Sequence, residues 1–140
     1  MQDKTRAALI AELRAIHQAS LQAHLDRDVQ FFTRDMSESY HSVSRGDINQ
    51  PTLEQTEAMF TRYLGATTFS RYEDLQEPVI GIADDGSVGW VMAQVAVSGE
   101  QSQGDETVPL NFVSAWIMLY RRVDGRWLRI GDASSFKAAD

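Results

Sequence analysis

Apolar residues in the first part of the chain follow a helical spacing. Residues 3–34 contain no Gly or Pro, and apolar side chains recur at helical intervals, at Leu9, Leu13, Ile16 and Ala23. This pattern predicts a helix that Asp3 caps at its start. The polar run 26–28 predicts a break. A short second helix is then expected around three apolar residues, Val29, Phe31 and Phe32.

A third helix is predicted to begin at Thr52. Gln55 lies three residues further on, as a capping box requires. The buried stripe of this helix consists of Leu53, Phe60 and Leu64. Gly65 is placed to end the helix in a left-handed conformation.

From about residue 69 the apolar period changes to two, which predicts strands. We expect strands over residues 40–43, 71–83, 88–98, 108–123 and 126–136. Pro78 favours an edge or a bulge, residues 99–105 form a polar loop, and Asp124-Gly125 predicts a hairpin. Helices followed by an antiparallel meander predict an α+β fold in one domain, residues 1–140.

The two central strands are apolar on both faces, whereas a sheet with one solvated face alternates apolar and polar residues. One phase is aliphatic and includes Val91, Ala93, Val95 and Val97, with Val113, Ala115, Ile117 and Leu119. The other phase is more amphipathic and includes Trp90, Met92, Gln94 and Ala96, with Phe112, Ser114, Trp116, Met118 and Tyr120. Helices can cover one face. A second copy of the chain is the simplest cover for the aliphatic face, which predicts a homodimer through the sheet.

Composition narrows the functional classes. The 140 residues carry a net charge of −7, which argues against binding to nucleic acid or to an acidic membrane. The chain has no cysteine and thus no disulfide or thiolate chemistry. We expect a cytoplasmic protein, because no signal peptide or long apolar run is present. Without a Gly-rich phosphate loop or a G-x-S-x-G motif, we expect no nucleotide cofactor and no serine-hydrolase mechanism.

The layout resembles the nuclear-transport-factor-two-like (NTF2-like) superfamily, in its SnoaL-like, ketosteroid-isomerase-like branch. Three stretches carry the resemblance. They are Asp28 ahead of Phe31-Phe32, the segment from Ser42 to the cap at Thr52, and the pair of strands over residues 116–136. The resemblance implies a cone-shaped, curved antiparallel sheet wrapped on N-terminal helices and enclosing a pocket. Many relatives carry histidine on the last strand, whereas Asp132 is the one acid in that stretch here.

His17, His24 and Asp132 are the candidate acid and base groups. The two histidines lie seven residues apart and share one face of the first helix. Each is either a proton-transfer group in the pocket or a helix histidine bonded to backbone or water. Asp132 is either a desolvated base in the cone or an acid that is exposed or paired with Arg129 or Arg45. Asp132 and His24 would form the one acid/base couple. Zinc needs three or four ligands, and the histidine spacing assembles no metal site.

The remaining candidates would line a ligand pocket. By analogy with the family, the Trp90 and Trp116 phases point into the cone, as do Asp132 and Ser134. The predicted ligand-contacting residues are His17, Tyr40, Trp90, Met92, Gln94, Ser114, Trp116, Met118 and Ser134. The aromatic residues and methionines could equally be core, and Gln94 and Ser114 could satisfy each other.

Two functions remain open at this point. The first is an enzyme of isomerase, dehydratase or cyclase type, acting on a small, largely apolar molecule through Asp132, His24 or Tyr40. The second is a non-catalytic dimeric module for binding or assembly. The fold does not choose between them.

Overall fold

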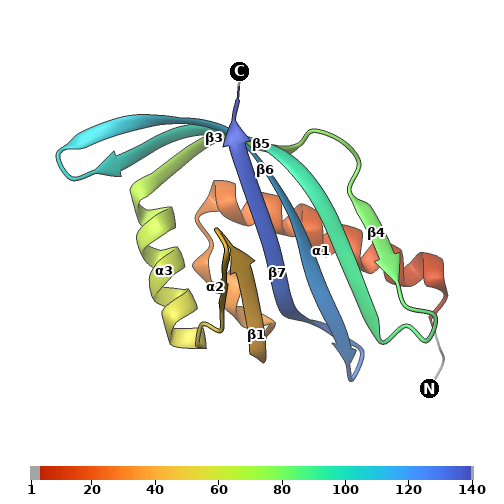
Figure 1. Cartoon of the computed structure of the whole chain (residues 1–140). Helices are drawn as coiled ribbons and strands as arrows, with labels where there is room; N and C mark the ends of the chain where they lie inside the picture. Colours follow the sequence, from red (N-terminus) through yellow and green to blue (C-terminus); the bar gives the residue numbers. More distant parts are fainter. Residues whose placement is uncertain (1–3, 140) are drawn as a thin grey trace.

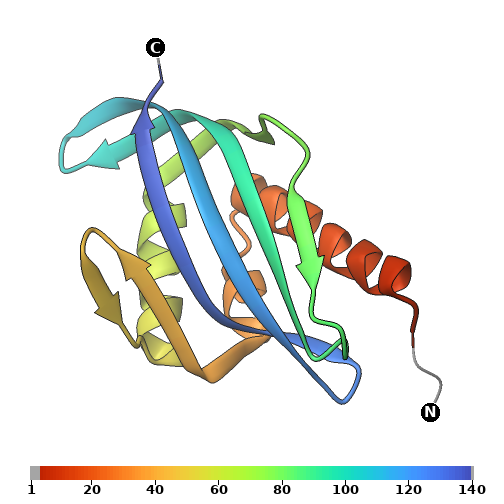
Figure 2. The ribbon, with the colours of Figure 1, turned by 45° about the vertical axis from the view of Figure 1, so that its right-hand side comes forward.

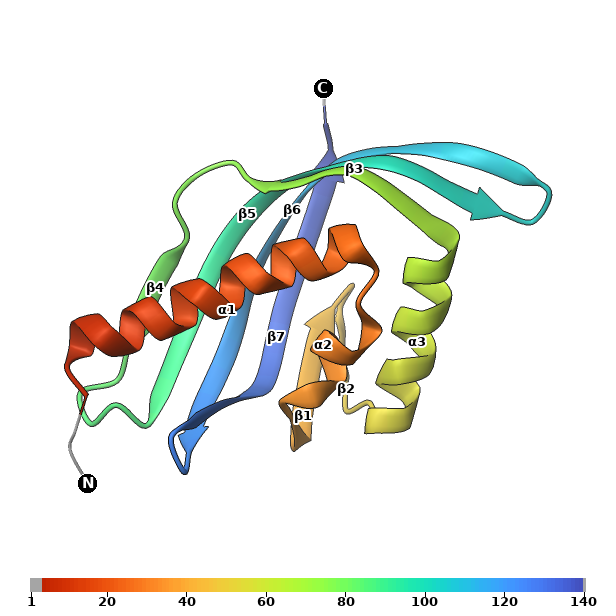
Figure 3. The ribbon, with the colours of Figure 1, turned by 180° about the vertical axis from the view of Figure 1, so that it is seen from behind.

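Helices cover one face of a strongly curved sheet in this computed structural model, which describes residues 4–139 (Figure 1). The helices are α1 (Arg6–Asp26), α2 (Val29–Arg34) and α3 (Leu53–Ala66). The strands are β1 (Met36–Ser44), β2 (Asp47–Asn49), β3 (Thr67–Asp74), β4 (Val79–Ile82), β5 (Val88–Gln103), β6 (Glu106–Val123) and β7 (Arg126–Ala138). Figure 3 shows α1 crossing the concave face, with α2 and α3 beyond its C-terminal end.

Local sequence accounts for the helix ends. Thr5 caps α1, since its side chain accepts a hydrogen bond from the Ala8 N–H; the predicted cap, Asp3, lies outside the described residues. The capping box of Thr52 and Gln55 is confirmed. The predicted stop at Gly65 is wrong, because α3 continues to Ala66 and passes directly into β3 at the extended residue Thr67.

The sheet is mixed rather than purely antiparallel. Its strand order is β2-β1-β7-β6-β5-β3, with β4 also paired to β5. All pairs are antiparallel except β1 with β7, which run parallel. The chain leaves β1 and β2, crosses through α3 to the far edge at β3, and returns strand by strand until β7 lies beside β1 (Figure 2). The antiparallel meander is therefore confirmed for the last strands, and the exception is the parallel pairing of β1 with β7.

Several strand boundaries differ from the prediction: β1 begins at Met36 rather than at residue 40, and β2 was not predicted. Two further differences are larger. The expected strand 71–83 is divided into β3 and β4, and Pro78 lies in the break between them. The expected loop 99–105 is a hairpin instead, in which β5 and β6 pair as far as Gln103 and Glu106. The polar side chains of residues 99–105 predicted a loop. Because the hairpin extends beyond the helices (Figure 1), both of its faces can carry polar side chains while its two strands remain hydrogen-bonded.

The inward face of β5 is the opposite of the predicted one. Val91, Val95 and Val97 are buried in the core under the helices. The register pairs Val91 with Met118, Ala93 with Trp116 and Val95 with Ser114, so these residues share the concave face. The inward phase of β6 is as predicted. On β5, where both phases are apolar, alternation carries no information about which phase faces the helices.

The convex face of the sheet carries an apolar strip that no helix or strand of residues 4–139 covers. Val79 pairs with Met92 and Met92 with Ile117, which places the three side chains on this face. Met92 is 44% exposed and Val79 is 53% exposed. Across residues 4–139, no helix combines the length and the apolar character needed to cross a bilayer.

Gly131 sets how closely β1 can approach β7. A Cβ added there would lie 2.8 Å from the backbone oxygen of His41. We expect Gly131→Ala to lower the free energy of unfolding by about 1–3 kcal/mol in urea denaturation. The control is Gly65→Ala in α3, where a Cβ would meet nothing within 4 Å, and it should raise stability by about 0.5 kcal/mol. Equal effects of the two variants would contradict this account.

Candidate functional site

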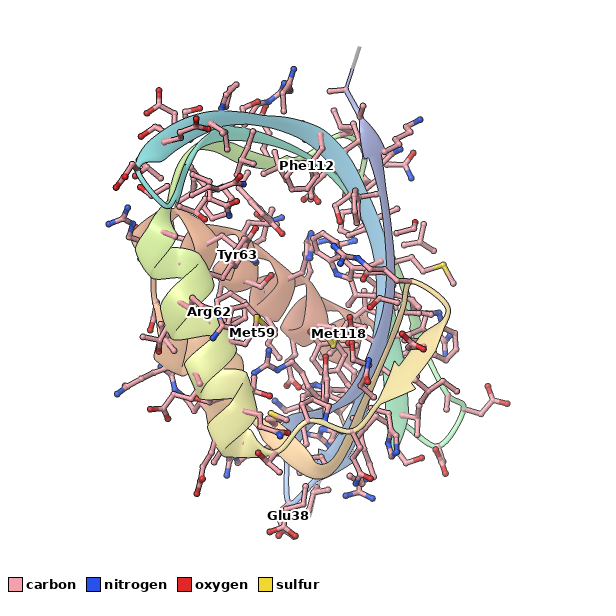
Figure 4. The ribbon with its side chains drawn as sticks, turned by 60° about the vertical axis from the view of Figure 1, so that its left-hand side comes forward. Glu38, Met59, Arg62, Tyr63, Phe112 and Met118 are labelled. Carbon is pink, nitrogen blue, oxygen red and sulfur yellow. The ribbon has the colours of Figure 1, made fainter. Side chains whose placement is uncertain are left out.

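A cavity of about 470 Å³ lies between the concave face of the sheet and helices α1, α2 and α3. Figure 4 looks into this region, with Met59 on α3 and Met118 on the sheet side. Its lining is mainly apolar, with polar side chains from α1 and α3 and from β1, β6 and β7. The sequence-predicted residues that line it are His24, Tyr40, Ser114, Trp116, Met118, Asp132 and Ser134.

The other predicted residues lie elsewhere. Trp90, Met92 and Gln94 occupy the convex face, so the prediction that they point into the cone is wrong. The Trp90 ring packs over Gly81 of β4, where an added Cβ would lie 2.2 Å from it. His17 is 2% exposed and its Nε2 contacts Asp74 Oδ1 at 2.8 Å, which ties α1 to β3.

Tyr40 and Asp132 meet inside the cavity because β1 and β7 run in parallel. The register places Ser42 opposite Asp132, so Tyr40, two residues earlier, lies on the same face. The Tyr40 hydroxyl donates a hydrogen bond to Asp132 Oδ1 at 2.8 Å. Burial raises the pKa of Tyr40 well above its usual value, and the neighbouring Asp132 carboxylate raises it further. Tyr40 therefore remains a protonated donor at neutral pH.

His24 is held as a neutral hydrogen-bond acceptor. Its Nδ1 lies 2.8 Å from the Ser20 carbonyl oxygen, which only accepts, so Nδ1 carries the proton. The ring stacks on Tyr72 with centroids 3.9 Å apart. Burial lowers the pKa of His24 to about 4, against the opposing effect of the Ser20 bond. His24 and Asp132 line the same cavity but make no hydrogen bond with each other among the described contacts.

Arg129 is the main polar residue that sequence analysis did not place in the pocket. Tyr120 pairs with Arg129 and Leu119 pairs with Gly131, which leaves Ile130 as a bulge. Because of this extra residue, Arg129 and Asp132 face the cavity together although one number is odd and the other even. Simple alternation along the strand would place them on opposite faces.

The guanidinium of Arg129 is enclosed by aromatic rings. Its Nη2 donates to the Phe31 carbonyl oxygen at 3.1 Å. The guanidinium carbon lies 5.7 Å from the Phe31 ring centroid and 6.0 Å from that of Phe32. Burial lowers the pKa of Arg129 from its usual value, and nearby tyrosines and carboxylates oppose this shift.

Other groups missed by sequence analysis are mostly apolar, and they come from α2 and α3. Phe31, Phe32, Met59 and Phe60 belong to this set. Thr56 of α3 also lines the cavity, and its buried hydroxyl has no hydrogen-bond partner among residues 4–139. Those residues contain no cluster of three or more His, Asp or Glu side chains that could hold a metal ion.

Solved structures share this fold at low sequence identity. A protein from Streptomyces avermitilis, described as a candidate dehydratase of the NTF2-like family, matches with a TM-score of 0.76 at 10% identity, over 96% of this chain and 100% of that one. A ketosteroid isomerase-like protein from Erwinia carotovora atroseptica matches with a TM-score of 0.70 at 14% identity, over 93% and 97%. An NTF2-like protein from Cytophaga hutchinsonii matches with a TM-score of 0.69 at 17% identity, over 97% and 100%. No protein-family profile and no curated protein sequence matches the chain.

The buried neutral His24 predicts a specific loss of stability in acid. The pKa of His24 in the folded chain, about 4, lies below the ~6.5 of an unfolded histidine. The unfolded chain therefore takes up the proton first as the pH falls. The contribution of neutral His24 to the free energy of unfolding is fully present above about pH 6.5. It decreases by roughly 2–3 kcal/mol as the pH falls towards 4.

Urea unfolding of His24→Phe between pH 7.5 and 4.5 measures this loss. We expect the variant to have a shallower decline than the wild type. The control is His41→Phe, at an exposed position on β1, which should retain the wild-type slope. Identical pH dependence of His24→Phe and the wild type would show that His24 is not the titrating group.

Proposed function

Because the chain has the NTF2-like fold, we propose that it binds a small, largely apolar molecule in the cavity and catalyses proton transfer on it, with Asp132 accepting the proton. The observation that carries this proposal is the hydrogen bond of 2.8 Å between Tyr40 and Asp132 inside an otherwise mainly apolar cavity. A carboxylate held in that position has the chemistry of a general base.

The other polar groups have supporting roles in this proposal. Tyr40 orients the Asp132 carboxylate and leaves its second oxygen free of any bond to a described side chain. The raised pKa of Tyr40 makes it a hydrogen-bond donor rather than a proton donor. His24 is neutral at pH 7, so its Nε2 can accept a hydrogen bond from the ligand. The predicted couple of Asp132 and His24 becomes a base and a neutral acceptor in the same cavity.

The similar structures support the reaction class. Among them are a ketosteroid isomerase-like protein and a protein described as a candidate dehydratase. Both names refer to reactions in which a proton moves to or from carbon or oxygen. A largely apolar cavity of about 470 Å³ suits a small, largely apolar substrate.

A second candidate function is a dimeric binding or assembly module without catalysis. The observation in its favour is the uncovered apolar strip of Val79, Met92, Ile117 and Leu119 on the convex face of the sheet. A second copy packed on this strip would remove it from water. Val95 was expected on the same face, but it is buried under the helices, so Ile117 is the position that tests the dimer.

Proton transfer can be tested without knowing the natural substrate. We expect the wild type to exchange the α-hydrogens of at least one of a panel of small cyclic ketones in D₂O, followed by NMR. Asp132→Asn keeps the shape of the side chain and should reduce exchange at least ~100-fold. The matched control is Asp124→Asn in the exposed β6–β7 turn, which should leave the rate unchanged. Equal exchange by Asp132→Asn and the wild type would remove Asp132 as the base.

Dimerisation is tested separately by native mass spectrometry. We expect the wild type to be a dimer and Ile117→Glu to be a monomer, because the introduced charge would be desolvated in the interface. The control is Ile48→Glu on β2, where Ile48 is 74% exposed and lies outside the apolar strip. A monomeric wild type, or a dimeric Ile117→Glu, would contradict pairing through this face. The same spectra show any small molecule retained from the expression host.

A further inference from the structure

Arg129 is a buried cation at the wall of the cavity. It is 8% exposed, and it lies on β7 beside the bulge at Ile130. A charged side chain removed from water is costly unless it is paired and hydrogen-bonded. Buried charges that lack such a partner therefore call for an explanation.

Most of the hydrogen-bonding capacity of this guanidinium is unused. A guanidinium has five N–H donors in a planar fork. In the described residues, the side chain makes one hydrogen bond, from Nη2 to the Phe31 carbonyl oxygen at 3.1 Å. No carboxylate of residues 4–139 lies within ion-pair distance of it. The rings of Phe31 and Phe32 lie within cation–π distance of the guanidinium. Such rings do not replace an anion, because they do not accept the hydrogen bonds of the in-plane N–H groups.

The two nearby carboxylates already have other partners. Asp35 pairs with the guanidinium of Arg126. Asp132 accepts a hydrogen bond from the Tyr40 hydroxyl. The chain thus supplies two acids near Arg129 and uses each for a different contact, which leaves the cation of the cavity without an anion of its own.

We propose that Arg129 binds a carboxylate of the ligand, so that the molecule taken up by this cavity is a small apolar acid. The proposal rests on ligand binding in the cavity and adds the chemical class of the ligand. A carboxylate on a guanidinium forms charge-assisted, often bidentate hydrogen bonds, which are among the strongest in proteins. The apolar body of the acid would lie against Trp116, Met118 and Phe60, which line the same cavity.

The position of Asp132 allows a test of which of two cavities beside Arg129 holds the acid. Asp132 lines the main cavity together with Arg129, whereas a smaller hollow of about 270 Å³ on the α1 side is lined by Arg129 without Asp132. An acid bound in the main cavity would feel repulsion from the Asp132 carboxylate. Removing that charge should strengthen the binding of an acid there, and it should not affect an acid in the smaller hollow.

The experiment compares an acid with its uncharged analogue. Calorimetric titration at pH 7.5 uses 2-naphthoate and 2-naphthamide, which have the same ring and differ in charge. We expect the wild type to bind 2-naphthoate at least ~10-fold more tightly than 2-naphthamide. Asp132→Asn should bind 2-naphthoate a few-fold more tightly than the wild type does and leave 2-naphthamide unchanged.

Two arginine variants separate the site from the overall charge. Arg129→Met should lose the ~10-fold preference for the acid and retain the affinity for the amide. Arg121→Met removes one positive charge from the exposed surface of β6 and should retain the preference. Arg129→Met should also unfold at or above the wild-type temperature, because it removes a buried charge and leaves Asp35 and Asp132 with their own partners.

Three outcomes would overturn the inference. They are an equal or weaker affinity for 2-naphthoate than for 2-naphthamide in the wild type, no binding of either probe, and an unchanged preference in Arg129→Met. The relative affinity of the wild type for 2-naphthoate and 2-naphthamide tests the inference even if a variant fails to fold. Binding of the amide alone would leave the proposed apolar ligand site intact and reject only the carboxylate, so the two proposals can fail separately.

Discussion

The candidate site depends on the parallel pairing of β1 with β7. The chain segment between them forms most of the sheet, so this pairing joins an early strand to the last one. Its register places Ser42 opposite Asp132 and Met36 opposite Arg129. Tyr40 therefore meets Asp132 and Arg129 in the cavity, although the two segments lie about ninety residues apart in sequence. They are held together by backbone hydrogen bonds, which are stiffer than contacts between flexible side chains.

Burial determines the chemical state of each polar group. Tyr40, His24 and Arg129 each have a hydrogen-bond partner and at least one remaining polar position. Burial keeps the histidine neutral at pH 7 and raises the pKa of the tyrosine, so that its hydroxyl stays protonated even in alkaline solution. An apolar cavity with a carboxylate, a cation, a donor and an acceptor can recognise a polar ligand while excluding most water. Such groups reduce the stability of the empty protein, which is the usual compromise at a binding site.

Sequence patterns predicted the parts that local chemistry determines. The capping box at Thr52 follows from spacing alone, and the inward phase of β6 follows from the resemblance to the family; both are found. The phase of β5 did not follow, because Trp90 and Val91 are both apolar and polarity could not distinguish the two faces. Arg129 was missed for a different reason. Gly131, next to Ile130, is the one sequence signal of a bulge or a close backbone approach. It does not show which residue is unpaired, because a bulge is a property of strand pairing.

The bulge at Ile130 also makes the cavity sensitive to insertions and deletions in an unusual way. Side chains after it project according to a register that one extra residue has shifted. Deletion of Ile130 would keep the pairs Tyr120–Arg129 and Met118–Asp132. One residue inserted between Leu119 and Tyr120 would instead pair with Ile130, restore simple alternation and turn Arg129 and Asp132 to opposite faces, with no substitution in the pocket itself. Divergent chains of this fold can thus acquire new cavity chemistry through a change of length by one residue. An alignment scored on substitutions alone would record such a change as a gap and miss its effect on specificity.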